Sequence, residues 1–546
     1  MKKLLTLPLL LLVFLLNTAH VGSPGVIYEG LIGPHRMLVH ILPPDVIPGI
    51  ATVSVILPDN PSISQIEARP VYWSAGLKGT PKADPIPAVK GELGKYEGEL
   101  WFMDGGTSSV QLQLIENGQT YEAIIPVMAV PTAKKDMPFD LGVILSLLGI
   151  FLVILLVTII ASAMGESILD PGMKSSPSAV KSKKWGIAIG SVLIILLLWG
   201  GKTWWDAESN TYQNYMYQPF VAESFVKNSG GEQLLHLRID SSELKNLKIT
   251  RRLSFLVPDH GKLMHLFLIK KGELDVFAHL HPQRIDTLNF EAPLPPLPAG
   301  DYHVFADITR YTGFSETIVS DLTITEQSSF QFTNNKTPLL GRDDTYTYST
   351  PVNASNKRLD ADIMVCGKPG IKTDLPGGYA AMWESDDEKF ETGKLYNLNF
   401  ALSDPTGNPA KLDPYLGMMG HAVVMKHDGT VFVHLHPTGN YSMGSQQMLL
   451  DRFQAGKVGF TGLPTNLSFP DSIDQVISFL DRLDDAERDK ILMGNMAHDK
   501  ALAEEHEAHS MVSFPYSFPQ PGQYRIWLQV KIEGNIVNGA FDVQVD

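Results

Sequence analysis

The sequence predicts a mainly β protein with three immunoglobulin-like β-sandwich domains, two transmembrane helices and a small helical insertion. Short apolar runs recur between turns, and the 546 residues include 46 Gly and 37 Pro, which is more typical of a turn-rich β protein than of a helical one. Two apolar runs in the first half are long enough to cross a membrane. An insertion at residues 465–511 shows apolar residues at helical spacing.

The chain begins with the pattern of a secretory signal peptide. Lys2 and Lys3 precede an apolar run over residues 4–16, and small residues follow near residues 19–23. Residues 1–22 are therefore expected to direct export, with an uncleaved anchor as the alternative.

Residues 24–138 are expected to form an extracytoplasmic β-sandwich. Runs such as 51–57 alternate apolar and polar residues, and Pro, Gly and Asn turns separate them. The Gly-Lys-Tyr-Glu-Gly-Glu-Leu-Trp-Phe segment at 94–102 resembles the small YtkA-like or FixH-like extracytoplasmic sandwiches. His35, Met37 and His40 lack the spacing of a tight ligand set, which favours packing or surface roles.

Two membrane spans are predicted, at residues 141–164 and 185–205. The first carries no charge, and the second is completed by Lys202 and a Trp pair at the interface. The loop 165–184 between them is lysine-rich, which places it in the cytoplasm. The sequence thus predicts a protein of the bacterial plasma (inner) membrane whose large domains are extracytoplasmic, in the periplasmic space.

Two similar stretches, 264–282 and 420–437, are predicted β-hairpins. Each starts near a histidine, passes a polar turn and closes on His-Leu-His-Pro. Asp428-Gly429 is a strong two-residue turn signal. With that turn, residues whose numbers sum to 857 face each other, so His421 faces His436, and His434 shares their side of the hairpin.

The same reasoning brings three histidines together on the first hairpin. Three neutral imidazoles make a plausible first shell for copper or zinc. The candidate metal ligands are His265, His279, His281, His421, His434 and His436. A structural role is the alternative, because a histidine in a half-buried strand is often only a hydrogen-bonded core residue. His260 and His303 are outlying candidates from neighbouring segments.

The two hairpins belong to domains predicted at residues 206–325 and 351–546, separated by a linker. Pro298-Ala-Gly-Asp-Tyr302 and Pro521-Gly-Gln-Tyr524 precede a late strand in each domain, which indicates a duplication. The second copy has the helical insertion 465–511, with one helix over 471–483 and a second over 484–509. Histidine and methionine residues along that second helix suit copper outside the cytoplasm, with core packing as the alternative for the methionines. They are Met493, Met496, His498, His506 and His509.

The hairpin motifs resemble a group of poorly characterised bacterial membrane-anchored proteins with repeated Phe-x-His-Leu-His-Pro hairpins. The matching segments are Pro258–Phe267, Phe277–Pro282, Gly420–Val423 and Phe432–Pro437. The resemblance covers most of residues 230–546. It implies that the histidines act as groups, and it suggests an association with heavy-metal or copper handling.

Composition and missing motifs exclude several function classes. The net charge of −15 argues against a nucleic-acid partner, and the single Cys366 rules out an internal disulfide. The sequence has no Gly-x-Ser-x-Gly, phosphate loop, His-Glu-x-x-His or Cys-x-x-Cys motif. No cysteine accompanies the histidine motifs, which argues against a blue-copper electron-transfer site.

The leading hypothesis is a membrane-anchored extracytoplasmic metal-binding protein that handles or senses copper or zinc without catalysis. Its expected partners are the metal ion, the membrane and a membrane or periplasmic protein. One alternative is an adhesion or assembly scaffold of tandem sandwiches with structural histidines. Another is a mononuclear metal enzyme, in which Asp275 or Glu505 would have to approach the ligands as a base.

Overall fold

The computed structural model confirms a mainly β protein. It describes residues 25–546 except 60–62, 64, 166–167, 170, 230–231, 245–252, 326–339, 350–351, 354–363, 366–367, 385–388, 459–467 and 495–509. The predicted signal peptide and Cys366 lie outside the described residues. The described part contains six sheets, whose strand pairs are antiparallel except for the pair β19–β28. It forms two compact units, residues 25–129 with 219–546, and residues 130–218.

The first two sheets enclose a core of residues from the range 26–129, and buried side chains alternate along some of their strands. In β3, for example, Ala51, Val53 and Val55 are buried and the residues between them are not. One sheet has the strand order β1-β2-β3-β6 and the other β5-β4-β7-β8. The strands are β1 Val26–Ile32, β2 His35–Leu42, β3 Gly49–Ile56, β4 Gln65–Tyr72, β5 Asp84–Pro85, β6 Lys95–Phe102, β7 Gly106–Glu116 and β8 Gln119–Ala129.

The second unit contains two helices, α2 (Phe139–Ala163) and α3 (Pro177–Tyr215). Both are long and apolar enough to cross a membrane. Helix α3 extends beyond the predicted span 185–205 at both ends, so the predicted loop 165–184 is shorter than expected. Its early start has a local cause, because Ser176 caps the helix by accepting a hydrogen bond from the backbone of Ala179 at 3.2 Å.

The first hairpin lies in the second of two further sheets, which enclose a core of their own. These sheets have the orders β14-β15-β10-β9 and β11-β16-β12-β13-β18, with β17 beside β16. The strands are β9 Ala222–Ser229, β10 Glu232–Ile239, β11 Leu256–Val257, β12 Met264–Lys270, β13 Val276–Leu280, β14 Gln283–Arg284, β15 Asn289–Pro293, β16 Gly300–Arg310, β17 Ser315–Ile324 and β18 Thr345–Tyr348. Strand β18 falls within the predicted linker 326–350, because it completes the sheet by pairing with β13.

The last two sheets have the orders β19-β28-β27-β24-β25 and β20-β21-β22-β23-β26, and the second hairpin lies in the first of these. The strands are β19 Val352–Asn353, β20 Met364–Val365, β21 Lys368–Asp374, β22 Ala380–Glu384, β23 Leu395–Ser403, β24 His421–Lys426, β25 Phe432–Leu435, β26 Met511–Ser517, β27 Gly522–Ile532 and β28 Asn535–Val545. Their core contains Trp383, Phe400 and Phe541.

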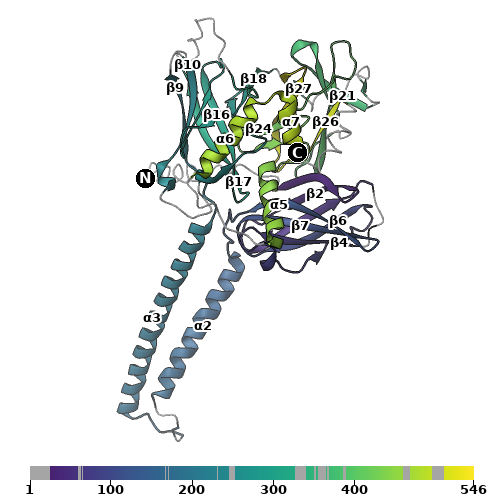
Figure 1. Ribbon diagram of the computed structural model, residues 1–546. Helices are drawn as coiled ribbons and strands as arrows, with labels where there is room; N and C mark the ends of the chain where they lie inside the picture. The colour runs from purple at the N-terminus through teal and green to yellow at the C-terminus, as the bar shows by residue number, and fades with distance from the viewer. Residues whose placement is uncertain are drawn as a thin grey trace. The chain divides into compact units, whose positions relative to one another are not determined.

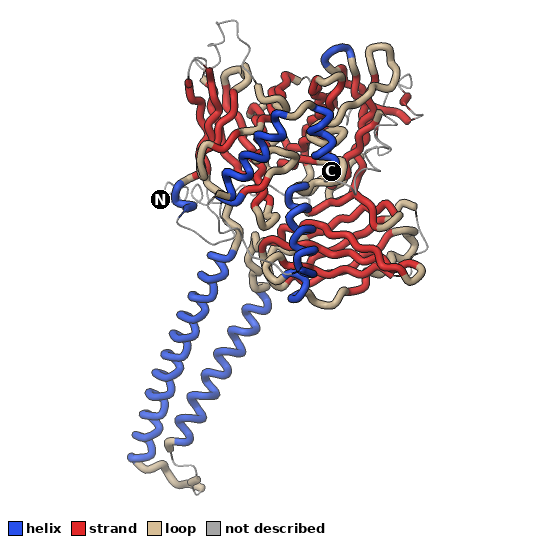
Figure 2. Tube along the Cα trace, in the orientation of Figure 1, coloured by secondary structure: helices blue, strands red, loops and turns tan. Residues whose placement is uncertain are grey.

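The two hairpin-bearing sheets also pack on each other through their outer faces. Side chains alternate along β12, so Leu266 and Leu268 enter their own core whereas Phe267 joins residues of the other sheet. The rings of Phe305 and Phe432 stack across this interface with centroids 4.0 Å apart. Both hairpins are therefore buried on both faces. Figure 1 and Figure 2 show the arrangement of the strands around them.

Within the described residues, three further helices follow the second hairpin in the chain, α5 (Met443–Val458), α6 (Phe469–Arg482) and α7 (Asp485–Gly494). Helix α5 precedes the predicted insertion 465–511 and was not expected. Helix α6 matches the first predicted helix. Residues 495–509 of the second predicted helix, with His498, His506 and His509, lie outside the described residues.

Candidate metal centre

The structure has the hairpin register that the sequence predicts. In the second hairpin Val423 pairs with His434 and Ala422 with Leu435, in agreement with the sum of 857. In the first hairpin Phe267 pairs with His279. These registers place the histidines of each hairpin on the face that packs against the other sheet, beside the aromatic contacts.

The first group of imidazoles consists of His265, His279 and His281. One ligand nitrogen from each ring lies within 4.8 Å of the others. Nδ1 of His265 is 3.1 Å from Nε2 of His279. The side chain of His281 is only 4% exposed, and the other two rings are buried as well.

Hydrogen bonds fix which nitrogen each of these rings turns toward its neighbours. Nε2 of His265 donates to the carbonyl of Asp259 at 3.1 Å. Nδ1 of His279 donates to Oε1 of Gln529 at 3.0 Å, and Nδ1 of His281 donates to Oδ1 of Asp344 at 2.8 Å. An acceptor on one nitrogen makes that nitrogen carry the proton, so the other nitrogen of each neutral ring presents a lone pair to the group.

These lone pairs face one another at a distance that suits a cation. Two metal–nitrogen bonds of about 2.0 Å at a tetrahedral angle hold their nitrogens roughly 3.3 Å apart, close to the 3.1 Å between His265 and His279. Two neutral imidazoles that share neither a proton nor a cation repel each other at this separation.

The second group consists of His260, His421 and His436, again with ligand atoms within 4.8 Å of one another. Nδ1 of His436 donates to the carbonyl of Tyr441 at 3.1 Å. His260 comes from the loop before β12, in a turn where its φ is +50° and that of Gly261 is +77°. This turn carries a candidate ligand from the two sheets of the first hairpin (the first hairpin sandwich, residues 222–348) to the histidines of the second hairpin.

His434 lies between the two groups. Its ring centroid is 5.4 Å from those of His265 and His421, and 4.6 Å from that of His436. Its Nδ1 is 3.5 Å from Oδ2 of Asp307. The structure thus brings all six predicted ligands together, but it groups His421 and His436 with His260 and leaves His434 beside both groups.

Several buried ring nitrogens of this cluster have no hydrogen-bond partner within the described ranges. They are Nε2 of His260, His281, His421, His434 and His436, and Nδ1 of His421. Buried polar atoms are normally paired, so this concentration of unpaired acceptors and donors calls for a ligand.

Burial and mutual repulsion keep these imidazoles neutral. Burial lowers the pKa of His265, His279, His421 and His434 well below the usual value, and the neighbouring imidazoles lower it further. The pKa of His436 is lowered to about 3 for the same reasons. Neutral imidazole is the form that binds a metal ion.

Three carboxyl groups border the cluster, at Asp259, Asp307 and Asp344. Burial raises the pKa of Asp307 to about 7. Burial also opposes ionisation of Asp259, but His260, His436 and His265 nearby lower its pKa overall. These carboxylates offer compensating charge for a bound cation.

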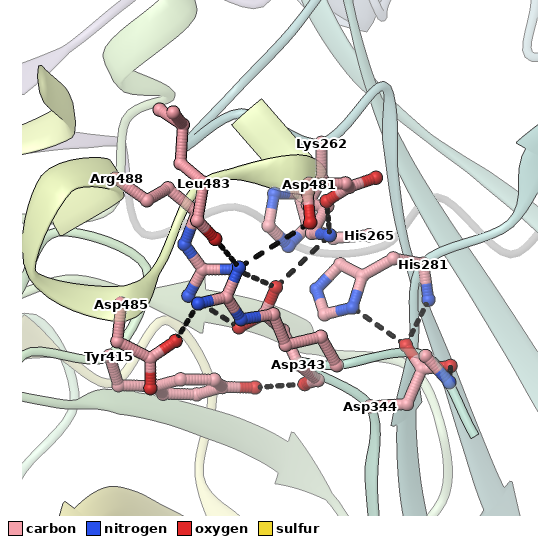
Figure 3. Close-up of polar contacts among 12 residues, drawn as sticks. Lys262, His265, His281, Asp343, Asp344, Tyr415, Asp481, Leu483, Asp485 and Arg488 are labelled. Atoms are coloured by element: carbon pink, nitrogen blue, oxygen red, sulfur yellow. Dashed lines mark hydrogen bonds and ion pairs between the residues drawn. The ribbon is translucent and has the colours of Figure 1, made fainter. Parts of the chain in front are cut away.

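An ion network fixes the segment that carries Asp344 (Figure 3). The guanidinium of Arg488 on α7 binds both carboxylate oxygens of Asp343, at 2.7 and 2.8 Å. Lys262 joins Asp343 at 3.0 Å and Asp481 at the end of α6 at 2.9 Å. The network ties α6 and α7 to the loops beside the first group, and so holds the carboxylate that orients His281.

Sequence reasoning missed part of this site. His260 was only an outlying candidate, and Asp259, Asp307 and Asp344 were not considered. The Asp259-His260 pair stands within the Pro-Asp-His-Gly motif, which was the available signal. His303 is outside the cluster and stacks on Phe305.

Comparison with known proteins gives a local match only. A model described as a domain of unknown function, DUF8832, matches residues 374–458, which include the second hairpin and its three histidines. No curated protein matches the chain.

Among solved structures, similarity is weak. E. coli alpha-2-macroglobulin in its native conformation matches at 7% identity and a TM-score of 0.18, over 96% of this chain and 23% of the other. An endo-fucoidan hydrolase from glycoside hydrolase family 107 matches at 8% identity and a TM-score of 0.15, over 96% and 44%. The chicken CNTN1 FN1–FN3 domains match at 6% identity and a TM-score of 0.12, over 93% and 97%. The chain thus spans under half the length of the first two.

Proposed function

We propose that this chain is a membrane-anchored extracytoplasmic protein that binds copper or zinc for handling or sensing, through the buried histidine cluster. The observation that carries the proposal is the set of hydrogen bonds in the first group. Each of its three rings donates one N–H outward and presents the other nitrogen inward. Such outer contacts fix the tautomer and orientation of metal-binding imidazoles.

The chemistry of the donors supports this choice of metal. Imidazole nitrogen suits copper and zinc, whereas magnesium and calcium prefer oxygen ligands. The alternative of structural histidines explains the outward hydrogen bonds but not the buried ring nitrogens without a partner in the described part of the chain, among them Nε2 of His281, His421 and His434.

Burial favours holding an ion over transforming a substrate. The side chains of His281 and His434 are 4% and 6% exposed, and His279 and His421 are fully buried. A bound ion therefore has little room for a large reactant beside it, which fits a role in storage, transfer or sensing.

Metal analysis of the full chain tests the proposal. The protein is purified in detergent, stripped with chelator, exposed separately to Zn(II) and Cu(II), desalted and measured by mass spectrometry. We expect stable uptake by the wild type and loss of uptake in His265→Ala/His421→Ala. The matched control is His303→Ala/His427→Ala, which removes two histidines outside the cluster and should bind like the wild type. Absence of uptake by a folded wild type refutes the proposal.

A further inference from the structure

The histidine cluster contains two complete ligand groups rather than one. The groups His265, His279, His281 and His260, His421, His436 have no member in common, and each brings three nitrogens within 4.8 Å. Three imidazoles already make a first shell for one ion of zinc or copper. Building on the proposed function, we propose that the cluster is a dinuclear centre that holds two ions side by side, one in each group, with His434 between them.

Ring contacts show how closely the two groups adjoin. The centroid of His260 in the second group lies 6.1 Å from that of His265 in the first. His434 contacts both groups, with its centroid 5.6 Å from His279 and 5.4 Å from His421. Its Nε2 is buried and has no hydrogen-bond partner among the described residues. If one ion takes three imidazoles of its group and His434 as a fourth ligand, and the other ion takes the three imidazoles of the other group, all seven rings are used.

Each group depends on both hairpin sandwiches. His260 belongs to the first sandwich but completes the group formed by the second hairpin. Conversely, the ring of His279 in the first hairpin is oriented by Gln529 on β27 of the second sandwich. The two groups therefore form together when the sandwiches pack, which favours two ions over one.

The surrounding charges also fit two ions. Asp344 contacts His281, Asp307 lies near His434, and Asp259 lies 3.6 Å from Nε2 of His260. Buried charges need nearby partners. The three carboxyl groups are thus distributed around both groups rather than gathered at one of them.

Stoichiometry measured on group-specific variants tests the proposal. The stripped full chain is loaded with Zn(II) and counted by mass spectrometry. We expect about two ions for the wild type, about one for His281→Ala, about one for His421→Ala, and near zero for the double variant. The control His303→Ala/His427→Ala should keep two. If a cluster variant fails to fold by circular dichroism, His281→Gln and His421→Gln replace it.

The outcomes separate this inference from the proposed function. One ion in the wild type that either single variant abolishes overturns the dinuclear centre but leaves metal binding intact, whereas no ion at all overturns both. Electron paramagnetic resonance of the Cu(II)-loaded wild type gives an independent readout. Spin coupling between two copper ions supports the inference, and a full-intensity uncoupled spectrum contradicts it.

Discussion

Replacing the carboxylate of Asp344 should weaken metal binding without removing any ligand. Oδ1 of Asp344 accepts hydrogen bonds from Nδ1 and the backbone N–H of His281, at 2.8 and 2.9 Å, and Oδ2 accepts from the backbone of Gly341 at 2.9 Å. The side chain is only 2% exposed, so water does not replace these contacts easily. Asp344→Asn keeps the shape of the side chain but removes its negative charge. It also places an amide N–H opposite one of the N–H groups that donate to Asp344.

The expected loss of metal affinity is the one caused by removing a residue that orients a metal ligand without binding the metal itself. Removing such a residue typically costs tenfold to a hundredfold in metal affinity, or about 1.4–2.7 kcal/mol. The assay is competition of Zn(II) between the full-length protein and a chromogenic chelator. The matched control is Asp301→Asn, since Asp301 accepts a hydrogen bond from Thr323 at an exposed position of the same sandwich. An affinity of folded Asp344→Asn within twofold of the wild type would refute the assignment of Asp344 as the residue that orients His281.

Three further predictions concern acid stability, the ion network and topology. The pKa of six cluster imidazoles is lowered by folding, so the unfolded state binds more protons below pH 6.5. Metal-free protein should therefore lose stability as pH falls from 6.5 towards 3, by up to about 1.4 kcal/mol per pH unit for each imidazole. Urea denaturation at pH 7, 6 and 5 measures this loss, and an unfolding free energy that does not change with pH contradicts the prediction. Arg488→Met leaves the buried Asp343 without its bidentate partner and should destabilise the protein by about 3–5 kcal/mol in the same assay, although Lys262 at 3.0 Å reduces the loss. The predicted topology places Lys183 in the cytoplasm and Lys90 outside it. In a Cys366→Ser background, Lys183→Cys should therefore react with an impermeant maleimide only after the cells are permeabilised, whereas Lys90→Cys should react in intact spheroplasts. The reverse labelling pattern would contradict the predicted orientation.

The local parts of the site could be predicted because they depend on rules of one hairpin. The Asp428-Gly429 turn fixes the register, and alternation then puts His434 on the same face as His436. The grouping of His260 could not be predicted in this way. It comes from a loop outside the hairpin and reaches its group only through packing between two sandwiches.

The same limit explains what was missed in the fold. The apolar runs of β12 and β24 are buried on both faces, so their pattern gives a strand but not the partner of each face. Strand β18 lies in a polar stretch and is defined by its pairing with β13. Helix α5 had one local signal, Ser442, whose hydroxyl accepts from the backbone of Ser445 at 3.1 Å.

The repetition of the His-Leu-His-Pro hairpin in the sequence accounts for the concentration of imidazoles. The two hairpin sheets pack through equivalent faces, so residues repeated in the sequence meet one another in space. Phe267 contacts Phe432 at one part of this interface and stacks on His279 at 4.2 Å at the other. The aromatic part keeps water away from the histidine part, and this burial is what holds the imidazoles neutral. The packing that joins the two hairpin-bearing sheets therefore also prepares the candidate ligands, so the interface and the proposed metal centre are expected to gain or lose stability together.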